Sequence, residues 1–112
     1  MSDCLFCKIV AGEIPSSKVY EDDVCYAFND IDPQAPNHFL VVPKAHIGSV
    51  SEITADNSTV VAHIFEVIAK LTKEKGLDSY RVVSNIGEQA GQSVFHLHFH
   101  VLSGRDMTWP PG

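Results

Sequence analysis

The chain has 112 residues, of which 45% are hydrophobic and 20% are charged, and its formal net charge is −6. This length suits one domain, and the composition excludes intrinsic disorder, collagen-like repeats and coiled coils. The negative charge argues against nucleic acid or an anionic membrane as the main partner, because both require a basic face. We therefore expect a single globular domain over residues 1–112, and a small ligand with one phosphate stays compatible with it.

The first half of the chain predicts four elements from the spacing of its apolar residues and from its turn residues. They are a short helix over residues 4–11, a hairpin of strands over residues 19–21 and 24–29, and a strand over residues 39–42. Gly12 and Pro15 end the helix, and Pro33 and Pro36 impose a loop before the third strand.

The second half predicts one long helix and two strands. They are a helix over residues 57–75, strands over residues 81–84 and 96–102, and a loop over residues 85–93 between the strands. The helix has apolar residues at Val61, Ile64, Ile68 and Leu71, and Gly76 follows it. The order α-β-β-β-α-β-β lacks regular βαβ alternation, so we predict an α+β domain with an antiparallel sheet.

The sequence shows neither the pattern of a membrane-spanning helix nor that of a signal peptide. No apolar run approaches the ~20 residues of a membrane helix, and the first residues lack the basic and apolar regions of a signal peptide. The chain has three cysteines, an odd number that argues against a disulfide framework and for reduced thiols or metal ligands. We therefore expect a cytoplasmic protein, with Cys25 as a buried small residue.

Three histidines alternate with apolar residues in the last predicted strand, at His96, His98 and His100. A period of two places their imidazoles on one face of the strand. The alternatives are an exposed polar face and a metal centre made of three histidines. At ~3.3 Å per residue the Cα atoms of His96 and His100 lie roughly 13 Å apart, whereas a Zn–N bond measures ~2.1 Å. At most two of the three can therefore share a metal, and at least one imidazole is free.

Free imidazoles on one face favour phosphoryl chemistry. Neighbouring histidines can divide the duties of nucleophile and proton carrier at neutral pH. The reaction also needs hydrogen-bond donors around the phosphate oxygens. Gly91, Gln92 and Ser93 enter the histidine strand with backbone N–H groups, an amide and a hydroxyl. This tripeptide alone is a weak signal, but it gains weight beside the histidines.

Residues 91–101, with the sequence GQSVFHLHFHV, strongly resemble the signature of the histidine triad (HIT) family. Residues 4–15 and 30–44 resemble two further segments of that family, and the ending WPPG at residues 109–112 resembles its Hint-like branch. The resemblance implies the HIT fold, a five-stranded antiparallel sheet with one long and one short helix, in a homodimer. It also implies hydrolysis of purine nucleoside 5′-phosphoramidates or acyl-adenylates through a covalent nucleotidyl-histidine.

The resemblance assigns roles to individual residues. The catalytic residues it implies are His98 as nucleophile, Ser93 and His100 at the phosphate and leaving amine, and His38 as a support for the triad. The substrate-binding residues it implies are Asp30 at the ribose hydroxyls, Asn85 and Gln92 at the phosphate, and Leu5, Phe6, Ile9 and Phe28 around the base. From the residues alone, His38 could be a polar residue at a strand start and the four apolar residues could be core. Asn29 stands where the branch often has histidine, which leaves the leaving-group preference open.

Cys4 and Cys7 form a CxxC motif, a recurrent half-site for zinc. Two ordinary cysteines on a short helix are an alternative, whereas a redox pair would need a βαβ context that the sequence lacks. Some bacterial HIT proteins with this motif use a histidine at the position of His46 together with the first triad histidine, here His96. The resemblance thus implies a structural zinc and no organic cofactor, with His63 as a competing ligand.

Two other functions stay open. A dinucleoside polyphosphate hydrolase or nucleotidyl transferase of the same superfamily would use the same histidine intermediate with a different acceptor, although the C-terminal ending argues against it. A non-catalytic protein that binds nucleotides or a protein partner could keep the triad. The expected partners are a purine nucleotide and a second copy of the chain, with no nucleic acid and no membrane.

Overall fold

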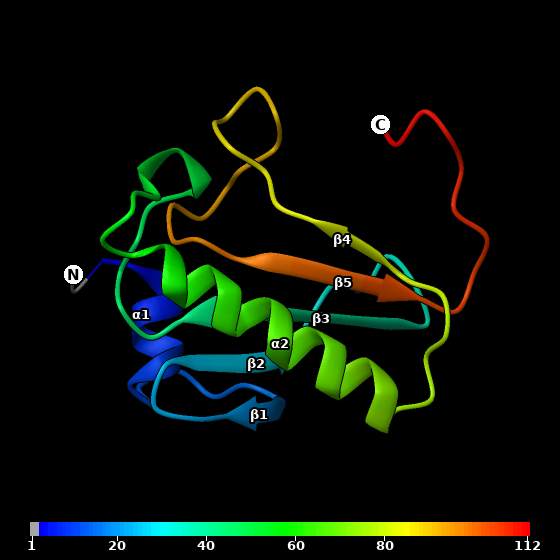
Figure 1. The fold of residues 1–112 in the computed structure, drawn as a ribbon, viewed down its shortest axis with the longest axis horizontal. Coiled ribbons are helices and arrows are strands. Elements are labelled where there is room, and N and C mark those ends of the chain that lie inside the picture. The colour runs from blue at the N-terminus through cyan, green and yellow to red at the C-terminus, as the bar shows by residue number, and fades with distance from the viewer. Residues whose placement is uncertain (1–2) are drawn as a thin grey trace.

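The computed structural model describes residues 3–112, which form two α-helices, one 3₁₀ helix and five strands (Figure 1). In chain order they are α1 (Leu5–Val10), β1 (Lys18–Glu21), β2 (Cys25–Asn29), β3 (Asn37–Pro43), η1 (Val50–Glu52), α2 (Ser58–Glu74), β4 (Arg81–Val83) and β5 (Phe99–Ser103). The strands form one antiparallel sheet in the order β1-β2-β3-β5-β4. The predicted α+β class and five-stranded antiparallel sheet are confirmed, with one long and one short helix.

The sheet has a core on each of its faces. Figure 1 shows α2 crossing the sheet, and this face packs against α2 through a cluster that includes Phe39, Val41 and Ile68. The opposite face packs against α1 through a smaller cluster that includes Phe6 and Leu40. Successive residues of β3 point to opposite faces, so all of its residues after the first are buried.

The long helix ends as the sequence predicts. The Gly76 N–H donates to the Lys73 carbonyl at 3.1 Å, and the Leu77 N–H donates to the Thr72 carbonyl at 2.9 Å. Gly76 has a φ of +70°, the left-handed conformation that this helix ending requires. No helix among residues 3–112 is both long enough and apolar enough to cross a membrane.

The last strand is shorter than the prediction over residues 96–102. Its ladder with β3 begins where Phe99 pairs with Val41. Before that point the Leu97 N–H donates to the Ile47 carbonyl at 2.5 Å, because β3 has ended at Pro43 and the following loop lies beside residue 97. The predicted start of this strand at residue 96 is therefore wrong, because of the three histidines only His100 lies within β5. The imidazoles still lie on one side, since the Phe6 ring of α1 packs against the rings of His96 and His98, and the His98 ring packs against that of His100.

Candidate functional site

A cavity of about 370 Å³ lies against the face of the sheet opposite α2. Its apolar wall is formed by Leu5, Phe6 and Ile9 of α1 with Phe28 and Leu40 of the sheet. Its polar wall is formed by Asn85, Gly91, Ser93, His98 and His100, and Asp30 also lines it. Such a cavity suits a ligand that joins an apolar ring to a charged group. All the residues predicted to be catalytic or to bind substrate line this cavity except His38 and Gln92.

His98 is held in one tautomer by the backbone. Its Nδ1 lies 2.7 Å from the His96 carbonyl oxygen, which can only accept a hydrogen bond. Nδ1 therefore carries the proton and Nε2 carries the lone pair. Burial lowers the pKa of His98, although the hydrogen bond to His96 opposes this, so the imidazole is neutral at pH 7. A neutral imidazole with a free Nε2 meets the chemical requirement for a nucleophile.

His38 lies behind His100 and sets its tautomer. The Gln34 N–H donates to His38 Nδ1 at 3.0 Å, so the His38 proton is on Nε2. That Nε2 lies 2.9 Å from His100 Nδ1 and 3.3 Å from Asp30 Oδ2. His100 consequently accepts at Nδ1 and carries its own proton on Nε2. Burial lowers the pKa of His100 to about 4, and the neighbouring His98 and His38 contribute in the same direction.

The loop before β5 supplies donors to the polar wall. The Asn85 amide and the Ser93 hydroxyl line the cavity, and both can donate to phosphate oxygens. Gly91 lies between them with a φ of +99°, a conformation that favours glycine. A Cβ there would lie 3.6 Å from the Asn85 amide nitrogen, so the backbone approaches this side chain closely.

The structure does not bring Gln92 to the cavity, which corrects the prediction that it contacts the phosphate. Its Oε1 accepts the Gly87 N–H at 2.9 Å, and its Nε2 donates to the carbonyls of Gly48 at 2.8 Å and Val94 at 3.2 Å. A buried amide needs such partners, and these three bonds engage both ends of it. Gln92 therefore braces the loop that carries Ser93.

Several lining residues were not placed in the site from the sequence. They are Pro15, Ser16, Ile31, Leu40 and Val94. The alternation of β3 could have indicated Leu40, because it pairs with Phe28 on one side and His100 on the other. Pro15 and Ser16 lie in a loop, where the spacing of apolar residues predicts nothing about side-chain direction. Ile31 also follows a strand end, and it lies at the rim of the cavity, where its side chain is exposed to solvent.

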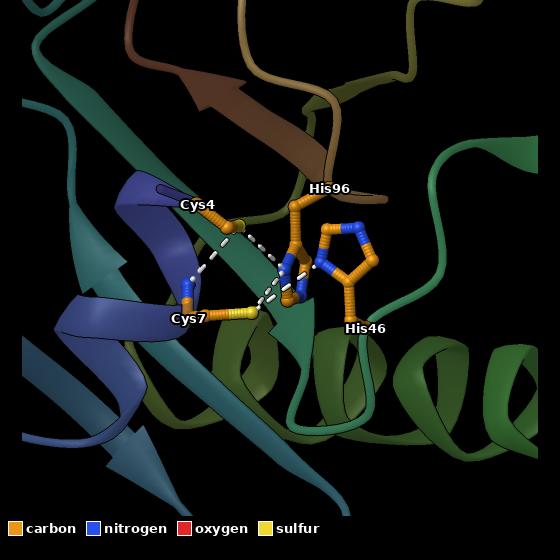
Figure 2. A group of neighbouring side chains, drawn as sticks. All are labelled: Cys4, Cys7, His46 and His96. Carbon is orange, nitrogen blue, oxygen red and sulfur yellow. Dashed lines mark hydrogen bonds between the residues drawn. The ribbon is translucent and has the colours of Figure 1, made fainter. Parts of the chain in front are cut away.

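Cys4, Cys7, His46 and His96 come together beside α1 (Figure 2), with all four ligand atoms within 4.8 Å of one another. His96 Nδ1 lies 3.3 Å from Cys4 Sγ and 3.5 Å from Cys7 Sγ, and His46 Nδ1 lies 3.3 Å from Cys7 Sγ. A tetrahedral zinc with bonds of ~2.3 Å to sulfur and ~2.1 Å to nitrogen separates those atoms by roughly 3.6 Å. The donor set and its spacing thus fit a four-coordinate zinc.

His96 is oriented toward the thiols by a second contact. Its Nε2 donates to the Pro43 carbonyl at 2.8 Å, which leaves the Nδ1 lone pair for a ligand. The side chain is 0% exposed, so its position is set by the protein and not by solvent. The competing ligand His63 lies elsewhere, because its Nε2 is 2.6 Å from Asp22 Oδ2.

Comparisons with known proteins agree with this geometry. A family model described as "Scavenger mRNA decapping enzyme C-term binding" matches residues 3–109. An uncharacterized HIT-like protein of Synechococcus elongatus is 46% identical over 111 residues, which cover 98% of this chain and 97% of that protein. Protein pkiA of Dictyostelium discoideum is 46% identical over 114 residues, with 98% and 90% covered.

Solved structures are similar over nearly the whole chain. A HIT family hydrolase from Legionella pneumophila Philadelphia 1 has a TM-score of 0.95 and 48% identity, with 98% of this chain and 100% of that chain covered. A histidine triad protein from Clostridium difficile has a TM-score of 0.93 and 52% identity, with 96% of each chain covered. The matches to these relatives, together with the histidines that line the cavity, show that the chain belongs to the histidine triad (HIT) family.

Proposed function

We propose that this protein hydrolyses purine nucleoside 5′-phosphoramidates and acyl-adenylates to the nucleoside monophosphate through a covalent nucleotidyl-His98 intermediate. The observation that carries the proposal is the 2.7 Å contact between His98 Nδ1 and the His96 carbonyl, which leaves the nucleophilic Nε2 free. The similarity to a solved HIT family hydrolase supports a hydrolytic reaction. The choice of a purine and of a phosphoramidate rests on the sequence resemblance to the Hint-like branch.

In the first step the His98 Nε2 lone pair attacks the α-phosphorus, and the P–N bond breaks with its electron pair on the amine. The amine leaves well only when it gains a proton. A bound phosphate adds negative charge near Asp30, so the hydrogen-bonded pair of His38 and His100 can hold one added proton and deliver it from His100 Nε2. The Asn85 and Ser93 donors bind the phosphate oxygens during this step.

In the second step water attacks the same phosphorus, and the bond to His98 Nε2 breaks. His100, now with a lone pair on Nε2, accepts the proton of the attacking water. The monophosphate leaves, His98 recovers its lone pair and the His38–His100 pair is again protonated.

We also propose that Cys4, Cys7, His46 and His96 hold a structural zinc. The fit of their distances to a tetrahedral site supports this proposal. When bound, zinc would tie α1 to the segment before β5, and four side-chain ligands would leave no position for an activated water.

We further propose that the protein acts as a cytoplasmic homodimer. Phe65 of α2 is exposed, and β4 is an edge strand of the sheet, so both offer surface to a second copy. The C-terminal tail runs away from the sheet beyond β4 (Figure 1), and its Trp109 is 82% exposed. Arg81 of β4 donates to the Thr108 carbonyl at 3.0 Å and so holds the base of this tail.

The experiment that tests the activity is incubation with adenosine 5′-phosphoramidate while AMP and ammonia are measured. A diadenosine polyphosphate and a nucleotide sugar with an acceptor are run in parallel. Turnover of the phosphoramidate alone is the expected result. Preferred cleavage of the dinucleotide, or transfer to the acceptor, would favour the alternative enzymes, and AMP binding with no turnover would favour a binding protein.

A further inference from the structure

A pair of hydroxyl groups lies at the side of the cavity remote from the catalytic histidines. Ser16 lines the cavity, and its Oγ lies 2.7 Å from the Tyr26 hydroxyl oxygen. Tyr26 belongs to β2, which is separated from β5 and His100 by β3. Strands ~4.8 Å apart put β2 roughly 10 Å from β5. The hydroxyl pair is thus on the nucleoside side of the cavity and not on the phosphate side.

Counting protons shows what this pair offers to a ligand. Each hydroxyl has one proton, and the bond between them uses only one of the two. Tyr26 is 8% exposed, and within residues 3–112 its hydroxyl bonds only to Ser16. A buried phenol proton left without an acceptor is unfavourable, so Tyr26 donates to Ser16. The Ser16 proton then stays free, and Ser16 presents an O–H donor to the cavity.

We propose that Ser16 is a base-recognition residue, whose hydroxyl donates a hydrogen bond to a ring nitrogen of the purine while Tyr26 fixes its orientation. This inference rests on the proposed function, in which a purine nucleotide occupies the cavity. The side chains of Phe6, Ile9 and Phe28 line the cavity and offer apolar surface to the ring of a bound purine. Apolar contact does not distinguish one edge of a ring from another, whereas a placed donor does.

The test is binding of AMP and of its 1-deaza, 3-deaza and 7-deaza analogues, measured by calorimetry with the wild type and Ser16→Ala. Each analogue lacks one of the ring nitrogens that can accept a hydrogen bond. A neutral hydrogen bond changes affinity by roughly 2- to 10-fold, so Ser16→Ala should weaken AMP binding by that factor. One analogue should bind the wild type and the variant equally, which identifies the nitrogen that Ser16 contacts.

Three further variants separate recognition from packing. Ser16→Thr keeps a hydroxyl and should retain the affinity of the wild type, and Tyr26→Phe should weaken AMP binding less than Ser16→Ala. Tyr20→Phe removes a hydroxyl that donates to Asp22 outside the cavity, so AMP affinity should not change.

Two results would overturn the inference alone: AMP affinity unchanged in Ser16→Ala, or an equal loss for AMP and all three analogues. A wild type that binds none of the four nucleotides would overturn the proposed function together with the inference. The two failures are therefore distinguished by the wild-type measurement.

Discussion

Replacing Cys4 and Cys7 together by serine should detach α1 from the sheet. The helix has six residues, well below the ~12–15 at which an isolated helix becomes marginally stable in water. It is therefore held by its contacts with the rest of the protein. Two of its side chains are buried, Phe6 at 5% exposed and Ile9 at 8% exposed. Val10 is partly buried against the same cluster, and the Cys4 and Cys7 thiols contact His96 and His46.

The size of the effect follows from these contacts. Two buried apolar side chains contribute about 3–6 kcal/mol at ~1.5–3 kcal/mol each. Ordering six backbone residues costs about 6–12 kcal/mol at ~1–2 kcal/mol each. Apolar burial therefore falls short by a few kcal/mol, which the proposed zinc at Cys4, Cys7, His46 and His96 would offset. A loss of ~3 kcal/mol in a domain of this length lowers Tm by roughly 10–20 °C.

The assay combines metal analysis, thermal unfolding and AMP binding, on protein purified without added metal or a histidine tag. We expect about one zinc per chain, absent from the double variant, together with the lower Tm. AMP affinity should fall because α1 forms part of the apolar wall. Turnover should persist, with KM affected more than kcat, although the Phe6 ring packs 5.0 Å from the His98 ring.

The matched control is Cys25→Ala, because Cys25 is a buried thiol that lies outside this cluster, in a separate group with Asp22 and His63. Its loss should leave the zinc at Cys4, Cys7, His46 and His96 in place. Metal-free wild-type protein would refute the reasoning. So would a double variant with unchanged Tm and unchanged AMP affinity, because α1 would then be stable without the cluster.

His98→Ala should lower the rate of phosphoramidate hydrolysis by roughly 10⁴-fold or more, because it removes the covalent nucleophile. The affinity for AMP should change little. Retained turnover, or a nucleotidyl adduct detected on the variant by intact mass, would contradict this prediction. His38→Ala should lower kcat by roughly 10²-fold on phosphoramidates and by less on acyl-adenylates, whose carboxylate leaves without a proton; equal losses would argue against proton delivery. Burial opposes ionisation of Asp22, but hydrogen bonds, the largest from the Cys25 backbone N–H, outweigh it and lower the pKa of this carboxyl. Because the unfolded pKa is about 3.9, the ionised Asp22 stabilises the fold above that pH and loses this effect as the pH falls below it. The Tm difference between the wild type and Asp22→Asn should therefore be constant at neutral pH and narrow in acid, and a difference independent of pH would contradict the assignment. Removing residues 108–112 should alter leaving-group selectivity more than kcat on a small substrate; equal effects on all substrates, or a monomer by light scattering, would contradict a dimer whose tail shapes the site.

Local patterns in the sequence were sufficient for the elements and for the inventory of reactive groups. The apolar spacing of the long helix and Gly76 after it identified α2 and its end, because both signals act within a few residues. The alternation of His98 and His100 with apolar residues indicated imidazoles on one face, and their rings do lie 5.0 Å apart. The resemblance to the HIT family added candidate roles, most of which fall on residues that line one cavity.

Hydrogen-bond partners were decided only by the tertiary structure. The resemblance to the HIT family named Cys4 and His96 as ligands of one site, but only the folded chain shows His96 Nδ1 3.3 Å from the thiol of Cys4, 92 residues earlier. The sequence cannot distinguish a Gln92 amide that binds a phosphate from one that braces a loop. The hydrogen bond to the Gly48 carbonyl shows that Gln92 braces the loop. Periodicity reports how a side chain is directed relative to its own element, whereas these partners lie on segments distant in the chain. The tautomer of His98, on which the chemistry depends, is set by the His96 carbonyl two residues earlier. That contact forms because the chain before β5 departs from the extended strand that the sequence predicted there.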